Sequence, residues 1–199
     1  MEQLAPYNPF IGQHLLTHVE GLTVDRAYIA HYVIPAASAT AAGAANVLAA
    51  TALTTAAQDI TTGITQPPTP RVLSITGNKS TAVGNVVITG TDAAGAALSE
   101  TIVSTGAATV VGTKAFATVT KITLPLLASP DGETISVGLA GAFGIPYKLP
   151  YDTILKIYNG GTATTVAVGS SFSASSLAAN YIKPTAALSG HQVDVYLIV

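Results

Sequence analysis

Hydrophobic residues alternate with small polar residues over most of residues 71–199, and this period of two predicts β-strands. In residues 71–76, Leu73 and Ile75 alternate with Ser74 and Thr76, and residues 134–139 repeat the pattern. Short strands at this spacing predict a mainly β fold, namely an antiparallel β-sandwich or barrel. The positions predicted to form its core are Leu73, Ile75, Val86, Ile88, Ile102, Phe116, Ile122, Ile135, Val137, Val195 and Leu197.

Turn-forming residues separate these predicted strands. The stretch TDAAGA contains Asp92, whose side chain can bond the backbone ahead of it, and a glycine that tolerates positive φ. The stretch NGGT at residues 159–162 predicts a tight hairpin. The last nine residues, HQVDVYLIV, are too apolar for a free end, so we expect them to pair inside a sheet.

The chain divides into three predicted parts, and the first two make up its N-terminal third. Residues 1–25 form a predicted extended arm, because Pro6 and Pro9 restrict its backbone. Residues 26–70 comprise a predicted strand at 26–34, an Ala/Thr-rich segment and the Pro-rich linker TQPPTP. Within the Ala/Thr-rich segment we expect strands and loops, with one short helix at 44–52. Residues 71–199 are the predicted β-sandwich or barrel domain.

The charged fraction is unusually low. It is 9%, whereas soluble domains average about 25%. No charged residue occurs between Arg26 and Asp59 or between Lys156 and Lys183. Two interpretations stay open, a small-residue β protein with a neutral surface or a protein whose surface is covered in an assembly.

Several partners are not supported by the composition. The net charge is −2 and the eight Lys and Arg residues are scattered, so we expect no nucleic-acid binding. The uncharged stretch at 27–58 is interrupted by polar residues, so we expect no membrane span, and no signal peptide is visible. The chain contains no Cys, which excludes disulfides and thiolate metal ligands.

No motif predicts catalysis, and we expect no catalytic, cofactor-binding or metal-binding residues. His14 and His18 have helical i, i+4 spacing, but the Glu that a zincin needs after the first His is missing. Asp131 and Glu133 flank a glycine turn and are interpreted as solvated turn charges. The stretch GLAGAFG at 138–144 lacks the dinucleotide-binding order and is interpreted as a loop.

One further motif and one competing function are also weakly supported. The stretch GNKS at 77–80 lacks the glycine-rich run of a phosphate-binding loop and is interpreted as a turn between strands. A carbohydrate-binding sandwich is a competing interpretation of the fold. The absence of Trp weakens it, although the chain has eight Tyr.

Residues 71–125 resemble virion structural proteins of tailed bacteriophages. The resemblance is carried by RVLSITGN, ITGTDAAG, LSETI and GTKAFATVTKI, with Leu-Pro closing the last strand. Such proteins are small and β-rich, and many are capsid decoration (cement) proteins. The resemblance implies a protein on the capsid surface that binds the major capsid protein from outside and stabilises the shell without catalysis.

A capsid role leads to two further expectations. We expect self-association, as a homotrimer, since a trimer suits the local threefold positions of an icosahedral shell. We expect the arm to be the main attachment element, with apolar anchors at Tyr7, Phe10, Ile11, Leu15 and Leu16. The arm folding back as an edge strand of its own domain is the alternative.

Two other functions remain open at this stage. One is a host-facing binding module, either a phage fibre or a bacterial surface adhesin domain. The other is a tail or connector component of the virion. Copy number per particle separates decoration proteins from both.

Overall fold

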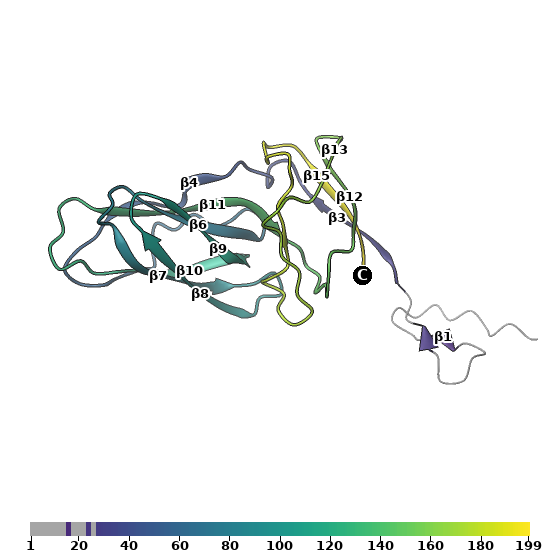
Figure 1. Cartoon of the computed structure of the whole chain (residues 1–199), viewed down its shortest axis with the longest axis horizontal. Coiled ribbons are helices and arrows are strands. Elements are labelled where there is room, and N and C mark those ends of the chain that lie inside the picture. The colour runs from purple at the N-terminus through teal and green to yellow at the C-terminus, as the bar shows by residue number, and fades with distance from the viewer. Residues whose placement is uncertain (1–14, 17–22, 25–26) are drawn as a thin grey trace, which may run out of the picture.

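The computed structural model describes residues 15–16, 23–24 and 27–199. This part of the chain contains β-strands and no helix. All strand pairs are antiparallel, and they form three larger sheets and one pair of two-residue strands. Two of the larger sheets face each other, and the third lies at one end of them (Figure 1). The predicted mainly β, antiparallel class is confirmed.

Two sheets make up the sandwich. In the first sandwich sheet, β11 is the central long strand, and β14 continues the sheet beyond β4 on the same side of β11. Its strands are β4 (Gly43–Ala52), β11 (Thr134–Gly144), β6 (Arg71–Gly77), β9 (Thr109–Phe116) and β14 (Tyr181–Ile182). The second sandwich sheet has the order β5 (Gln58–Ile60), β10 (Thr118–Leu124), β7 (Val83–Thr91) and β8 (Ala97–Thr105).

The third sheet, called the C-terminal sheet here, places the last strand of the chain beside a strand from the start of residues 27–199. Its order is β13 (Thr162–Thr164), β12 (Ile154–Asn159), β15 (Val193–Ile198) and β3 (Ile29–Ile34). The apolar last strand thus pairs on both sides, as its sequence predicts. A separate short pair joins β1 (Leu15–Leu16) to β2 (Thr23–Val24).

Within the described residues the sheets keep free edges and do not close into a barrel. Of the two predicted architectures, the sandwich is therefore the observed one.

All eleven predicted core residues are buried, but they belong to two separate clusters. Nine of them fill the space between the two sandwich sheets, where apolar side chains interdigitate. Val195 and Leu197 instead pack under the C-terminal sheet, against Phe143 and Ile145. The strand β11 therefore contributes to both clusters, since Ile135 lies in the first and Phe143 in the second.

The predicted short helix at 44–52 is wrong, because β4 occupies Gly43–Ala52. The high helix propensity of alanine is a weak preference that tertiary pairing overrides. Here β4 pairs with β11, with register shifts on either side of the Leu48–Val137 pair, and buries Val47 and Leu48 in the sandwich core.

The prediction of a loop at 138–144 is also wrong, because these residues are the second half of β11. Small residues are needed there for close approach of β4. A Cβ on Gly138 would lie only 1.8 Å from the backbone oxygen of Gly43. The glycines of this stretch therefore allow close backbone packing within a strand.

The predicted turns are confirmed. The Asp92 carboxylate accepts hydrogen bonds from the backbone N–H groups of Ala94 and Ala96 at 2.9 and 3.0 Å. The hairpin between β12 and β13 turns at Gly160 and Gly161, whose φ angles are 59° and 78°. Two successive positive φ angles are what a two-residue hairpin of type I′ requires.

Residues 27–70 contribute strands to all three larger sheets, through β3, β4 and β5. The Pro-rich stretch at 65–70 is fastened to the sandwich at both ends. The Gln66 side chain exchanges two hydrogen bonds with the backbone of Val119, at 2.8 and 2.9 Å. The Pro70 carbonyl accepts a hydrogen bond from Gly144 N–H at 2.7 Å.

Candidate docking surface

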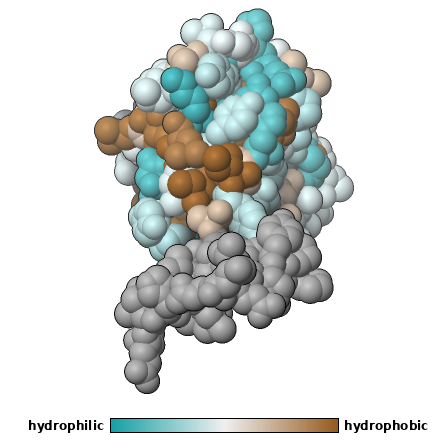
Figure 2. All heavy atoms as spheres, turned by 90° about the vertical axis from the view of Figure 1, so that its right-hand side faces the viewer, coloured by the Kyte–Doolittle hydropathy of each residue, from teal (hydrophilic) through white to brown (hydrophobic). Residues whose placement is uncertain are grey.

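The end of the molecule that carries the C-terminal sheet exposes large apolar side chains. Ile29 on β3 is 70% exposed, Leu155 on β12 is 50% exposed and Val199 at the chain end is 42% exposed. Figure 2 faces this end and shows hydrophobic residues gathered on one part of it, with hydrophilic residues on other parts. A contiguous exposed apolar area of this kind is typical of a binding surface.

Among the described residues, β3 forms the outer edge of this sheet, and no described strand pairs with its other side. Tyr28 and Val199 exchange two backbone hydrogen bonds, at 3.0 and 2.9 Å. Antiparallel pairs alternate between bonded and non-bonded, so the backbone groups of Ile29, His31 and Val33 point away from β15. No described residue forms a backbone hydrogen bond with these three on that side.

Aromatic rings cluster on the outer face of the same sheet. The His31 ring stacks on Tyr196 at 4.4 Å between centroids, and Tyr158 meets Tyr196 edge to face at 6.3 Å. The His31 Nε2 lies 2.9 Å from the Asp194 carboxylate. Because Tyr196 is covered by His31 on one ring face, this cluster does not present the open ring faces that a sugar platform uses.

A second neutral surface is a groove over the outer face of the first sandwich sheet. Its floor includes Ala140 and Gly141 of β11 and its wall includes Val111 of β9, which is 55% exposed. The groove runs from Gly43 on one side to Tyr181 and Lys183 on the other. Its lining contains no carboxylate, so the groove is a concave and mostly apolar surface without an acidic group.

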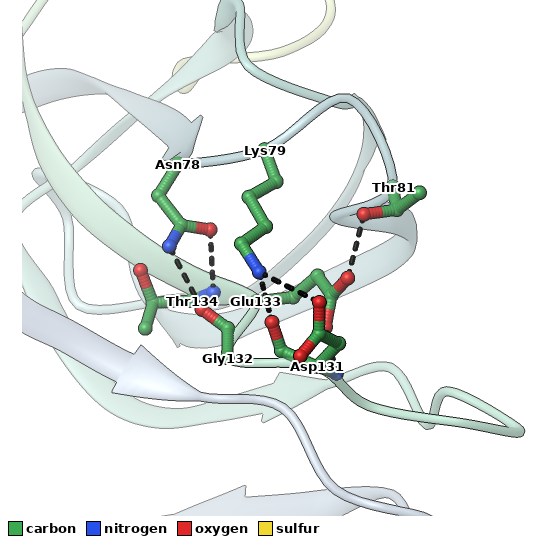
Figure 3. A network of polar contacts seen from close by, with 7 residues as sticks. All are labelled: Asn78, Lys79, Thr81, Asp131, Gly132, Glu133 and Thr134. Atoms are coloured by element: carbon green, nitrogen blue, oxygen red, sulfur yellow. Dashed lines mark hydrogen bonds and ion pairs between the residues drawn. The ribbon is translucent and has the colours of Figure 1, made fainter.

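A polar network ties two loops together at the β6–β7 and β10–β11 connections (Figure 3). The Asn78 side chain donates to Gly132 O at 2.9 Å and accepts from Thr134 N–H at 2.8 Å. The Lys79 ammonium contacts the backbone oxygen of Asp131 and lies 3.2 Å from its carboxylate. The GNKS stretch is thus a turn held by hydrogen bonds, as interpreted from its sequence.

The interpretation of Glu133 as a solvated turn charge is wrong, because this side chain is buried. Its carboxylate accepts hydrogen bonds from the Thr81 hydroxyl at 2.6 Å and from Asp131 N–H at 2.5 Å. These donors favour the ionised form and lower the pKa of Glu133, with the Thr81 bond as the largest cause. The exposed Asp131 does fit the prediction. The network therefore holds the two loops together, and Glu133 is the buried carboxylate within it.

Two further charged groups are buried inside the fold. Arg71 donates to Thr40 O at 2.9 Å and to Ala140 O at 2.5 Å, and burial lowers its pKa to about 10. Glu100 accepts from the backbone N–H and the hydroxyl of Thr113 at 2.5 and 3.0 Å, where β9 is irregular. Both groups hold backbone segments in place, and neither is paired with an opposite charge among the described residues.

The predicted contact residues fall mostly outside the described part of the chain. Tyr7, Phe10 and Ile11 lie outside it, and so do His14 and His18. Leu15 and Leu16 form β1, which pairs with β2. The prediction that these five arm residues, from Tyr7 to Leu16, contact a partner therefore stays a prediction.

The exposed residues of β3 were not among the predicted contacts. The alternation in IAHYVI was a signal for them, because it places Ile29 and Val33 on one face of a strand. That the strand would lie at a sheet edge depends on the sheet order, which the alternation does not contain.

Two other features were sought among the described residues, a metal site and a membrane-spanning helix. Among them, no group of three or more His, Cys, Asp or Glu side chains is placed to hold a metal ion. They also contain no helix with the length and apolarity needed to cross a membrane.

Comparison of the chain with protein-family models, with curated proteins and with solved structures finds no match.

Proposed function

We propose that this chain is a structural protein of a tailed-phage virion that binds the outside of the capsid, stabilises the shell and associates with itself. The proposal carries no catalytic step. It begins from the resemblance of residues 71–125 to decoration proteins, a segment that supplies β6, β7, β8, β9 and β10 of the sandwich.

The observation that carries the proposal is the exposed apolar end with the open β3 edge. A sheet edge that no described residue covers, beside exposed Ile29 and Val33, suits the self-association in this proposal, through strand addition between protein chains. The low charge supports the same function, because charged groups cost free energy when an interface removes them from water without a partner.

The copy number of the protein in particles tests this function. Purified virions of the phage that encodes the chain are dissolved, and the 20.0 kDa band is quantified on a denaturing gel against the major capsid protein. A decoration protein gives a molar amount comparable to the capsid protein. A band present in only a few copies would instead assign the chain to the tail or connector. No band at all would contradict a virion role.

A host-facing binding module is the second candidate, and the aromatic cluster of His31, Tyr158 and Tyr196 favours it. Such a module would bind isolated host cells or their surface glycans and would not bind undecorated capsids. Binding of purified protein to the two surfaces in parallel therefore separates the candidates. The covered faces of the stacked rings make the capsid candidate the stronger one.

A further inference from the structure

The long edge strands of the two sandwich sheets are each covered in part by another segment. On β4, the Val47 carbonyl accepts from Thr65 N–H at 2.9 Å. On β8, the Ser99 carbonyl accepts from the Lys114 ammonium at 2.7 Å. On β9, Ala115 N–H donates to Ala178 O at 2.8 Å.

The strand β3 lacks such cover from the described residues. It is six residues long, and its pairing with β15 shows no register shift. Its sequence, IAHYVI, contains no Pro and no Lys, Arg, Asp or Glu, the residues that commonly protect an edge. An edge of this kind is a template for pairing with another strand.

We propose that β3 pairs with β3 of a second copy of this chain, antiparallel, about a twofold axis that passes through His31. The two C-terminal sheets then join into one continuous sheet across the interface. The contact is isologous, because the same strand contributes on both sides.

The backbone of β3 matches itself in this register. Ile29, His31 and Val33 carry the outward backbone groups, and the axis at His31 places Ile29 opposite Val33 of the second copy. Each of the three resulting pairs can exchange two N–H to C=O bonds. Pro35, which has no N–H, stands just beyond the strand and ends the ladder there.

The side chains are complementary in the same register. On the outer face, exposed Ile29 and Val33 meet as apolar pairs across the interface. On the inner face, small Ala30 lies opposite large Tyr32. A shift of the register by one residue would turn the unpaired backbone groups away from each other and exchange the two faces.

This inference specifies how the self-association in the proposed function takes place. It rests on the proposed function only for where the dimer acts, which is the capsid surface. Twofold pairing gives a dimer, whereas the capsid role led us to expect a trimer. The experiments below use purified protein without capsids, so their failure would leave capsid binding untouched. Likewise, failure of capsid binding would leave the strand pairing untouched.

Cysteine cross-linking tests the register directly, because the chain contains no native cysteine. In His31→Cys, the two Cα atoms at position 31 would lie about 5.5 Å apart, within the roughly 4.4–6.8 Å span of disulfides. We expect disulfide-linked dimers on mild oxidation. Ile29→Cys alone should remain unlinked, because its two copies lie four residues apart along the strands, about 13 Å.

One mixture and one control complete this experiment. Ile29→Cys mixed with a tagged Val33→Cys protein should give a linked heterodimer. Val111→Cys, on exposed β9, should give none. Unchanged melting temperatures identify the folded variants. Equal linking of His31→Cys and Ile29→Cys, or no linking of His31→Cys and of the mixture, would overturn the proposal.

Sedimentation tests the association without oxidation. The full chain should sediment at micromolar concentration with twice its 20.0 kDa chain mass. Val33→Lys should shift it to the single-chain mass, because it places an ammonium opposite Ile29 of the partner. The matched change Val111→Lys, at another exposed valine, should leave the dimer intact. A single-chain mass for the unmodified protein, or a trimer insensitive to Val33→Lys, would contradict the pairing.

Discussion

Glu133 is a buried carboxylate that helps to hold together two connections distant in the sequence. Its hydrogen bond from the Thr81 hydroxyl joins the β6–β7 loop to the β10–β11 loop, and its bond from Asp131 N–H lies within the β10–β11 loop. The sequence could not reveal this role. Asp131 and Glu133 look alike beside a glycine turn, and the hydroxyl of Thr81, 52 positions away, gives Glu133 its partner in the other loop.

The ionisation of Glu133 makes the stability of the protein depend on pH. Its pKa is lower in the folded chain than the ordinary 4.5. The stabilising effect is therefore present above the unfolded pKa and is lost as the pH falls through the folded pKa. We expect Glu133→Gln to lower the melting temperature at pH 7 and to make the acid-side melting curve flatter than that of the unmodified protein.

Thermal melts between pH 7 and pH 2 measure this effect. Asp131→Asn is the matched control, because that carboxylate belongs to the same network but is exposed. If Glu133→Gln and Asp131→Asn shift the melting temperature equally at every pH, the stabilising role of the buried Glu133 carboxylate is wrong.

At the scale of the strands, alternation in the sequence was enough to identify the core faces. Val86 and Ile88 are buried where Val87 and Thr89 are not, and β15 alternates in the same way. In β6, Ser74 is buried as well as Leu73 and Ile75. The pattern did not show which sheet each strand joins. For that reason it combined Val195 with Ile135 in one predicted core, although they pack in different clusters.

The two errors at the strand scale have a common physical cause. In residues 44–52 and 138–144, Ala and Gly replace the larger residues that make a strand visible in a sequence. These strands are adjacent in the first sandwich sheet, and small side chains let their backbones approach closely. The stabilising contact is between strands, so neither segment reveals it alone. The open β3 edge was missed because it depends on sheet order.

The burial of β11 predicts a large effect from truncating one of its side chains. Ile135 is fully buried between the sandwich sheets. We expect Ile135→Ala to lower the free energy of unfolding by about 2–5 kcal/mol, through lost apolar burial and a residual cavity. Denaturant titration measures it. Leu126→Ala, at a residue 54% exposed, should change stability by less than about 0.5 kcal/mol. Equal effects would contradict the core assignment.

At the scale of the whole molecule, the apolar end and the N-terminal arm offer two different attachment elements. The arm, residues 1–25, has few charges and several apolar anchors, and β3 follows it directly along the chain. We expect the arm to bind the capsid and the β3 edge to join copies of the chain. The two functions can then be removed one at a time.

Deletion of residues 2–20 separates attachment from folding. We expect binding to undecorated capsids to fall sharply while the sandwich melts near its original temperature, because the described cores are formed by residues after 27. A sharper version replaces Tyr7, Phe10 and Ile11 together with Ser. Its matched control replaces Gln3, Asn8 and Gln13 with Ala, which leaves the apolar anchors in place and should preserve binding.

The possible results of the deletion are distinct. A melting temperature that collapses together with binding would show that the arm belongs to the folded core, as an edge strand of its own domain. Unchanged binding and unchanged melting would place the attachment surface elsewhere, in the uncharged segments 36–58 or 157–182. Because the groove over the first sandwich sheet includes residues of both segments, such as Gly43 and Gly169, it would then be the first surface to mutate. Loss of binding with an intact dimer would confirm that attachment and self-association use separate elements.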